Sequence, residues 1–418
     1  MESIDEASIP GQPRANTARR VLLLCFIIAM IEGYDLVIPS LTAPLISKAF
    51  GIGMREVGEF FSLGYVGIFA GSLVAGQLAD FVGRRPIMTA FLAVTAAATL
   101  GCAIAPTFTV LLLVRFVAGL GLGGSLPSLF ILTAEHSPES GQNARVVLMY
   151  VGYPLGAVVG GFITSSLLRS GFGWQGIFVG GGIAALLMVP LALMIPESMP
   201  PALKAVAADA GFFSALSRAK VQFAQGRLRA ALLMWLGFFC MMMMTYLLVS
   251  WTPTMAAKSG LPLSTAALSN VVLSFGGILG ALALGPIVSR KGPFAPAATI
   301  VGIAALLITL LGYSFGSVPL LMSLLFLVGF TGLGGQLLIP AMGIELFPAD
   351  VRGTGSGWMM AVGRLGSIAG ALLGGALLAA RFDVGQLYVV VALSAATAAV
   401  SFALAGRVRP SRRAAIVP

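Results

Sequence analysis

The chain has 418 residues, of which 58% are hydrophobic and only 10% are charged. Because a soluble globular protein carries about 25% charged residues, this composition excludes a chain whose whole surface faces water. The net charge of +10 does not indicate nucleic-acid binding, since Lys and Arg stand between long apolar runs rather than on one polar face.

Apolar runs of about 20 residues or more predict α-helices that cross a membrane. Charged residues, Pro and Gly separate such runs along the whole chain. The predicted spans are 20–46, 56–79, 86–105, 108–134, 144–168, 174–195, 229–253, 264–288, 294–315, 318–343, 355–380 and 385–406. The expected fold class is therefore an all-α integral membrane protein with twelve transmembrane helices.

A long polar interruption divides the predicted spans into two sets of six. We expect a cytoplasmic N-terminal tail at 1–19, an N-terminal six-helix bundle at 20–195, a cytoplasmic linker at 196–228, a C-terminal six-helix bundle at 229–406 and a cytoplasmic tail at 407–418.

Basic residues gather in the segments on the side that would hold both termini. The exceptions, in the opposite loops or within spans, are Lys48, Arg55, Arg169, Lys258, Arg381, Arg115 and Arg364. The positive-inside rule then predicts cytoplasmic termini. We expect a multi-pass protein of the inner (plasma) membrane, in contact with the lipid bilayer and not with nucleic acid.

Short motifs recur at an offset of about half the chain. Gly76 and Gly83, after the second span, recur as Gly285 and Gly292 after the eighth. Since each half has an even number of spans, the repeats run parallel and are related by an axis along the membrane normal. Two parallel-repeat six-helix bundles around a central cavity are the expected architecture.

Charged residues within the spans are functional candidates, because a charge near the bilayer centre is costly. Asp35 lies about 22 Å from the inner end of its span, and Arg115 lies at a similar depth, so the two could pair. Our hypothesis is that Asp35 carries a coupling proton; the alternative is a permanent ion pair that only fixes the helices. Glu32, one turn earlier, either shares this role or lines the cavity.

Residues 76–86 read G-Q-L-A-D-F-V-G-R-R-P. This run resembles the signature loop of the major facilitator superfamily, G-x-L-a-D-r-x-G-R-[RK]-P, which implies a role in conformational gating. Here Gly76 would allow close helix approach, Asp80 would accept hydrogen bonds from the opposite half, and Arg84 and Arg85 would hold the loop at the anionic leaflet.

The same resemblance implies further gating residues, which are Gly83, Glu135, Glu345 and Arg352. Glu135 ends the fourth span, and we expect it to contact basic loop residues at an inner gate. Glu345 is its repeat counterpart and is expected to play the matching role.

Within the superfamily, the chain resembles the aromatic acid:proton symporters, and among them carriers of 3-hydroxyphenylpropionate-like acids. Their first-span motif [DE]-G-x-D appears at 32–35, and later segments similar to theirs lie at 352–355 and 363–366. The resemblance implies import of a small aromatic carboxylate by proton symport, with protons as the coupling ion, no cofactor and a monomeric carrier.

Arg364 lies about 14 Å into its span, in the half that has no acidic residue at this depth. A guanidinium there needs an anion, and its fork of donors suits a carboxylate. We predict that Arg364 binds the substrate carboxylate; the alternative is pairing with backbone carbonyls or with Glu32. Side chains at matching depth that could hold the ring, or that only pack, include Tyr34, Tyr150, Tyr153, Tyr246, Gln336 and Trp358.

Three other classes of function would require sequence features that this chain lacks. A proton-driven exporter would share the fold, but such antiporters usually carry G-P-x-x-G-G where 156–161 reads G-A-V-V-G-G. A membrane enzyme would need a nucleophile, base or metal cluster, and the sequence has one His and no matching motif. A receptor-like sensor would need a longer tail than 407–418. Benzoate-type, phenylpropanoid-type and muconate-like acids all remain compatible as substrates.

Overall fold

The computed structural model describes residues 15–138, 141–197, 228–336, 339–347 and 352–408. Every regular element within these residues is helical. The N-terminal half contains α1 (Ala15–Phe50), α2 (Met54–Val82), α3 (Arg84–Ala103), α4 (Phe108–Glu135), α5 (Gln142–Arg169) and α6 (Trp174–Leu193). The C-terminal half contains α9 (Leu228–Lys258), α10 (Leu263–Lys291), α11 (Phe294–Leu311), α12 (Val318–Val328), η1 (Gly329–Leu333), α13 (Gly334–Gln336), α14 (Ile339–Leu346), α15 (Arg352–Ala379) and α16 (Val384–Val408).

The predicted membrane spans are confirmed. Within the described residues, 12 helical stretches are long and apolar enough to cross a membrane. Several helices extend beyond the apolar runs, as α1 does to Phe50 and α9 does to Lys258. A basic residue in the last turn, Lys48 in α1 and Lys258 in α9, suits the negative end of the helix dipole, which helps the helix to continue there.

The tenth span differs from the single helix predicted at 318–343. Its α-helical hydrogen bonding is interrupted by the π-helical turn η1. Glycines bring this turn against the backbone of α10: a Cβ on Gly329 would lie 2.0 Å from the Leu273 carbonyl oxygen. Apolar runs do not reveal such a turn, because a π-turn and an α-helix have the same composition.

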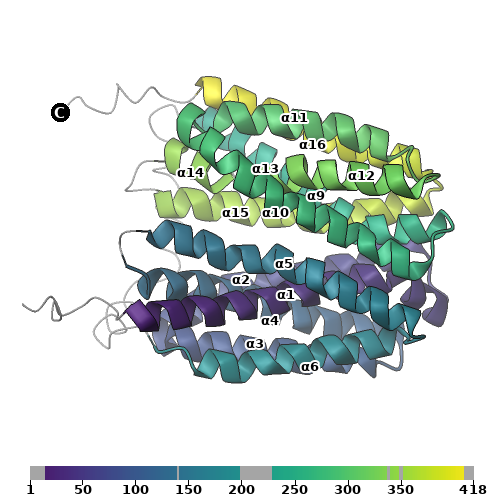
Figure 1. The fold of residues 1–418 in the computed structure, drawn as a ribbon, viewed down its shortest axis with the longest axis horizontal. Helices are drawn as coiled ribbons and strands as arrows, with labels where there is room; N and C mark the ends of the chain where they lie inside the picture. Colours follow the sequence, from purple (N-terminus) through teal and green to yellow (C-terminus); the bar gives the residue numbers. More distant parts are fainter. Residues whose placement is uncertain (1–14, 139–140, 198–227, 337–338, 348–351, 409–418) are drawn as a thin grey trace, which may run out of the picture.

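The two halves of the chain lie side by side, with α1 and α16 bringing the described chain ends to the same end of the bundle (Figure 1). Within the N-terminal half α1 packs on α5 and α2 on α4, and within the C-terminal half α9 packs on α15 and α16. The halves meet chiefly where α2 contacts α15 and where α5 contacts α10.

Contacts between the halves join residues in the parts of the spans far from the chain termini. The Ser62 hydroxyl donates to the Ile368 carbonyl (3.0 Å), and the Ser165 hydroxyl donates to the Ser264 carbonyl (2.8 Å). A Cβ on Gly58 would lie 3.1 Å from the Gly375 Cα, so α2 and α15 are in backbone contact there. The bundle is therefore closed on the side opposite the termini.

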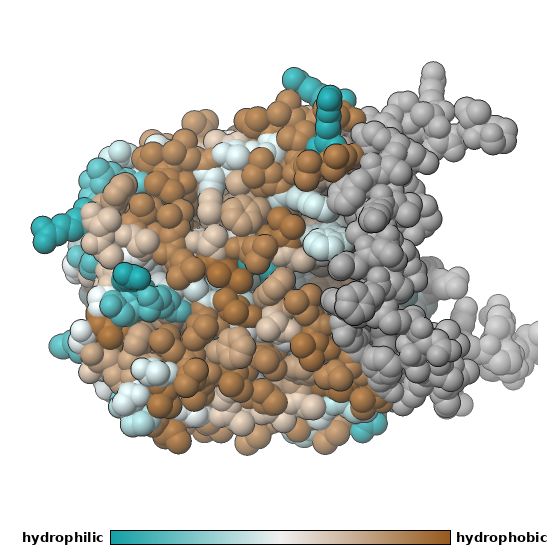
Figure 2. Space-filling model, turned by 180° about the vertical axis from the view of Figure 1, so that it is seen from behind, coloured by the Kyte–Doolittle hydropathy of each residue, from teal (hydrophilic) through white to brown (hydrophobic). Residues whose placement is uncertain are grey.

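The outer surface of the bundle is apolar across its middle. Figure 2 shows hydrophobic side chains over most of the visible face, with hydrophilic side chains gathered towards its ends. Large apolar side chains such as Leu113, Leu306 and Leu393 are among the exposed ones. This arrangement suits a surface that faces lipid around the sides and water at the two ends.

Candidate functional site

Asp35 lies in a polar cluster buried inside the N-terminal half. Its carboxylate faces the Arg115 guanidinium of α4 at 3.5 Å and accepts a hydrogen bond from the Thr99 hydroxyl of α3 at 2.8 Å. Both charged side chains are almost fully buried, with 1% and 2% exposed. The pairing expected from the depth of the two residues is therefore present, and both carboxylate oxygens of Asp35 have partners.

Glu32 is also fully buried, but its surroundings differ. One carboxylate oxygen accepts a hydrogen bond from the Ser125 hydroxyl of α4, whereas Oε2 has no hydrogen-bond partner among the described residues. None of the salt bridges within the described part of the chain includes Glu32. A buried ionised carboxylate without a cation is costly, so this group is well suited to hold a proton.

Tyrosines from both halves gather around the level of Glu32. Tyr150 and Tyr153 of α5 stack with ring centroids 5.9 Å apart, and Tyr246 of α9 meets Tyr65 of α2 edge to face at 4.7 Å. Tyr153 is within electrostatic range of Glu32 and Tyr246. The rings of α5 and α9 thus face the same region between the halves.

Arg364 reaches this region from α15. Its guanidinium forms neither a salt bridge nor a hydrogen bond with any described residue, although its charge acts on Tyr150 and Tyr153. Within the described part of the chain, Arg364 therefore pairs neither with Glu32 nor with a backbone carbonyl. A half-buried cation beside stacked rings is able to bind an aromatic carboxylate.

The remaining predicted ring contacts lie in different places. Gln336 accepts a hydrogen bond from Thr245 in the C-terminal half. Tyr34 packs against Gly160 inside the N-terminal half. Trp358 stacks on Trp235, about 9 Å before Arg364 along α15 and nearer the start of that helix.

The loop between α2 and α3 contains an ion pair. Arg84 pairs with Glu135, so Glu135 contacts a basic residue of this loop, and its role at an inner gate stays a prediction. Gly83 has a φ of 120°, a conformation that favours glycine. The backbone N–H of Arg85 donates to the Glu197 carboxylate at 3.2 Å, so the start of the linker region contacts this loop.

The second half repeats part of this arrangement. Gly292, the counterpart of Gly83, has a φ of 76°, and a Cβ there would lie 3.8 Å from Glu345 Oε2. Glu345 thus lies beside its half's loop, as Glu135 does. The side chains of Asp80 and Arg352 lie outside the described residues.

The close helix approach expected at Gly76 is not seen among the described residues, and the gating role of Gly76 stays a prediction. A Cβ at this position would meet no described atom within 4 Å, so no helix approaches Gly76 closely in this conformation. The physical reason is that the halves make their close contacts near the other ends of α2 and α15.

Several polar partners were missed by the sequence reasoning. Thr99, Ser125 and Thr245 each hydrogen-bond to a candidate residue on another helix. Ser and Thr are common in membrane helices, and nothing in their spacing marks these three.

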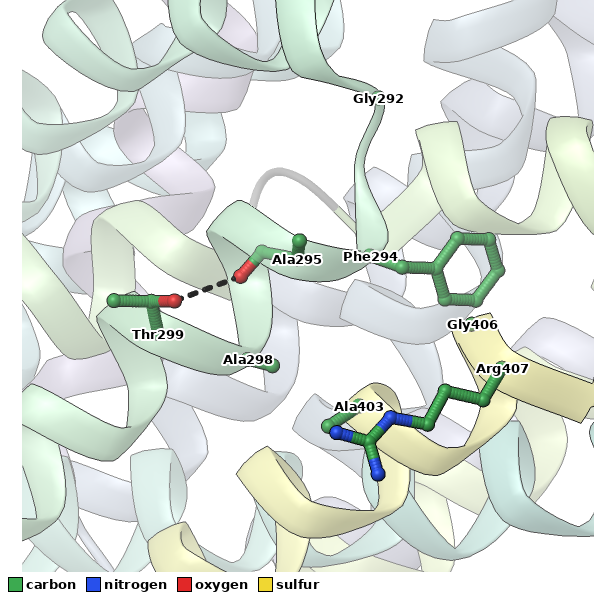
Figure 3. A pocket seen from close by; sticks show the side chains of 8 residues that line it. All are labelled: Gly292, Phe294, Ala295, Ala298, Thr299, Ala403, Gly406 and Arg407. Atoms are coloured by element: carbon green, nitrogen blue, oxygen red, sulfur yellow. Dashed lines mark hydrogen bonds between the residues drawn. The ribbon is translucent and has the colours of Figure 1, made fainter.

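A separate pocket of about 360 Å³ lies between α11 and α16, at the end of the bundle that holds the described chain ends (Figure 3). Small side chains such as Ala298 and Ala403 line it, and Arg407 lies at its edge. It contains none of the candidate residues of the central region.

Comparison with known proteins agrees with this picture. The 4-hydroxybenzoate transporter PcaK of Pseudomonas putida is 31% identical, and the match covers 97% of each chain. The 3-(3-hydroxy-phenyl)propionate transporter of Escherichia coli (strain K12) is 34% identical over 88% of this chain and 89% of its own.

A solved structure has the same fold. The D-xylose-proton symporter superposes with a TM-score of 0.74 at 17% identity, covering 92% of this chain and 97% of its own. The family model described as Major Facilitator Superfamily matches residues 22–371. The resemblance inferred from the signature loop is confirmed, as is the expectation of a transporter rather than an enzyme: the chain belongs to the Major Facilitator Superfamily.

Proposed function

We propose that this protein imports a small aromatic carboxylate by proton symport, through alternating access of a central site. The observation that carries the proposal is the half-buried Arg364 guanidinium, which has no hydrogen-bond or ion-pair partner among the described residues and lies within electrostatic range of the hydroxyl groups of the stacked Tyr150 and Tyr153. Relatives over nearly the whole chain are transporters of 4-hydroxybenzoate and 3-(3-hydroxy-phenyl)propionate, which support the same substrate class.

Two carboxyl groups of α1, those of Glu32 and Asp35, are candidates to carry the coupling proton. Glu32 has an unpaired buried oxygen, so binding of a proton removes the cost of a lone charge there. Asp35 already has Arg115 and Thr99 as partners, so its proton binding would require that the ion pair open during the transport cycle. Glu32 is therefore the better holder of the proton in the conformation described.

The proposed location is the inner (plasma) membrane, with both termini in the cytoplasm and the carrier acting as a monomer. The excess of basic residues on the side of the termini supports this orientation. An anion imported with one proton moves no net charge, and each additional proton would add about 2.3 kcal/mol per 100 mV of driving force.

The test is uptake of labelled benzoate, 4-hydroxybenzoate and 3-hydroxyphenylpropionate into right-side-out vesicles, with and without an inward proton gradient. Accumulation of at least one acid only with the gradient is expected. Gradient-driven loss of a preloaded cationic dye, with no uptake of any acid, would instead favour the exporter.

A further inference from the structure

Gln336 presents one end of its amide group without a strong partner. The Thr245 hydroxyl donates to Gln336 Oε1 at 3.0 Å, while Nε2 contacts only the Met242 sulfur, at 3.7 Å, among the described residues. A thioether sulfur is a weak acceptor. The donor end of the amide therefore keeps unused hydrogen-bonding capacity.

The backbone around Gln336 is held firmly. Gln336 ends α13, directly after the π-helical turn η1, and a Cβ on Gly334 would lie 2.8 Å from the Gly280 Cα. Such close backbone contact leaves the segment little freedom to slide or rotate against α10. Single π-turns are frequent at functional sites, where they change the direction of a side chain.

One face of α9 connects Gln336 with the proposed carboxylate site. Met242, Thr245 and Tyr246 lie three and four residues apart, so they share that face. A Cβ on Gly363 would lie 3.2 Å from Met242 Cγ, so Met242 packs beside the residue that precedes Arg364. The backbone just before Arg364, the Gln336 amide and the Tyr246 ring thus adjoin the same turn of α9.

We propose that Gln336 donates a hydrogen bond from Nε2 to an oxygen substituent on the ring of the carboxylate bound at Arg364, and thereby selects hydroxylated aromatic acids. Thr245 is a positioning residue, because its bond to Oε1 turns the donor end of the amide towards the substrate. This inference rests on the proposed function and adds the ring substituent to it.

The experiment compares acids that differ in one ring group. Inhibition constants against uptake of labelled 4-hydroxybenzoate are measured for benzoate, the 3- and 4-hydroxybenzoates and the 3- and 4-methylbenzoates. Each constant is measured in the native chain, in Gln336→Leu, in Thr245→Val and in the control Gln175→Leu. A methyl group is close in size to a hydroxyl but accepts no hydrogen bond. Gln175 is exposed near the start of α6.

The native chain should prefer at least one hydroxybenzoate over its methyl counterpart. Gln336→Leu should raise the inhibition constant of that hydroxy acid by about tenfold. The inhibition constants of benzoate and of the methyl acids should change by less than about twofold. Thr245→Val should reduce the same preference in part, and Gln175→Leu should leave it unchanged.

Two results would overturn this inference and leave the proposed function intact. In one, the native chain takes up acids but binds the hydroxy and methyl acids equally well. In the other, Gln336→Leu raises the inhibition constants of all the acids by the same factor. Failure of the native chain to take up any of the acids would overturn the proposed function itself.

Discussion

Glu32 and Asp35 stand one turn apart on α1, yet their neighbours differ. Asp35 has a guanidinium and a hydroxyl as partners, whereas Glu32 has one hydroxyl and an unpaired oxygen. In a transport cycle driven by protons, these two environments favour different roles, with Glu32 gaining and losing the proton and Asp35 holding Arg115 in place.

Glu32→Gln should therefore uncouple transport from the proton gradient. The amide preserves the contact with Ser125 but cannot ionise, so gradient-driven accumulation is expected to fall by at least about tenfold. Exchange of labelled for unlabelled acid should persist, because it needs no net proton movement. Glu59→Gln, at a partly exposed position on α2, serves as the control, and native accumulation in Glu32→Gln would rule out this role.

Asp35→Asn tests the earlier hypothesis that Asp35 itself carries the proton. Removing one charge of a buried pair leaves Arg115 uncompensated, which is expected to lower the free energy of unfolding by about 3–5 kcal/mol. Less folded protein is then expected. Proton uptake per molecule of folded carrier equal to that of the native chain would exclude Asp35 as the proton carrier; the measurement is substrate-induced proton uptake normalised to folded protein.

Arg364→Lys should raise the substrate concentration for half-maximal uptake by about tenfold, because an ammonium group cannot form the two parallel hydrogen bonds that a guanidinium makes to a carboxylate. Arg381→Lys, at an exposed position after the same helix, should leave it unchanged. Unchanged concentration dependence in Arg364→Lys would remove Arg364 from the substrate site.

At the scale of the helices, glycines set how closely α1 and α5 approach. A Cβ on Gly156 would lie 1.8 Å from the Met30 carbonyl oxygen, and a Cβ on Gly33 would lie 1.9 Å from that of Tyr153. Since Tyr153 and Glu32 lie on these two helices, the glycine contacts also fix the distance between the proposed proton site and the proposed ring site.

Gly156→Ala should therefore destabilise the N-terminal half by about 1–3 kcal/mol or more, because the added methyl group forces the two helices apart. Thermal unfolding in detergent checks this. Gly180→Ala is the matched control, since a Cβ there would meet nothing within 4 Å. Equal melting temperatures for the two variants would contradict the close packing of α1 on α5.

At the scale of the whole molecule, the closed end of the bundle is held by contacts between its halves. The Tyr65 and Ser250 hydroxyls are 2.8 Å apart, and the Asn270 amide donates to the Ser40 hydroxyl at 3.0 Å. These bonds must break for the site to open on that side, and hydrogen bonds of modest strength permit this.

The pair Ser165→Cys and Ser264→Cys should trap the closed side. The native Ser165 hydroxyl lies 2.8 Å from the Ser264 carbonyl, so a short cleavable thiol cross-linker should join the two cysteines. Cross-linking is expected to abolish uptake, and reduction to restore it. Each single cysteine variant provides the control, and native uptake by the cross-linked protein would show that this contact need not open.

The sequence by itself determined the number of spans, their order and the family, and it predicts the orientation. These features depend on local apolar runs, the distribution of basic residues and a loop motif, all of which are read along the chain. Depth also showed that Asp35 and Arg115 could pair, since a rise of about 1.5 Å per residue places both residues at one level, but their contact is a feature of the tertiary structure.

Only the tertiary structure decided which polar groups meet. Glu32 is bonded by Ser125, and Gln336 is bonded by Thr245, in each case from another helix. These contacts therefore depend on helix rotation and crossing rather than on spacing in the chain. The open surroundings of Gly76 have the same origin, because they depend on how closely a neighbouring helix approaches.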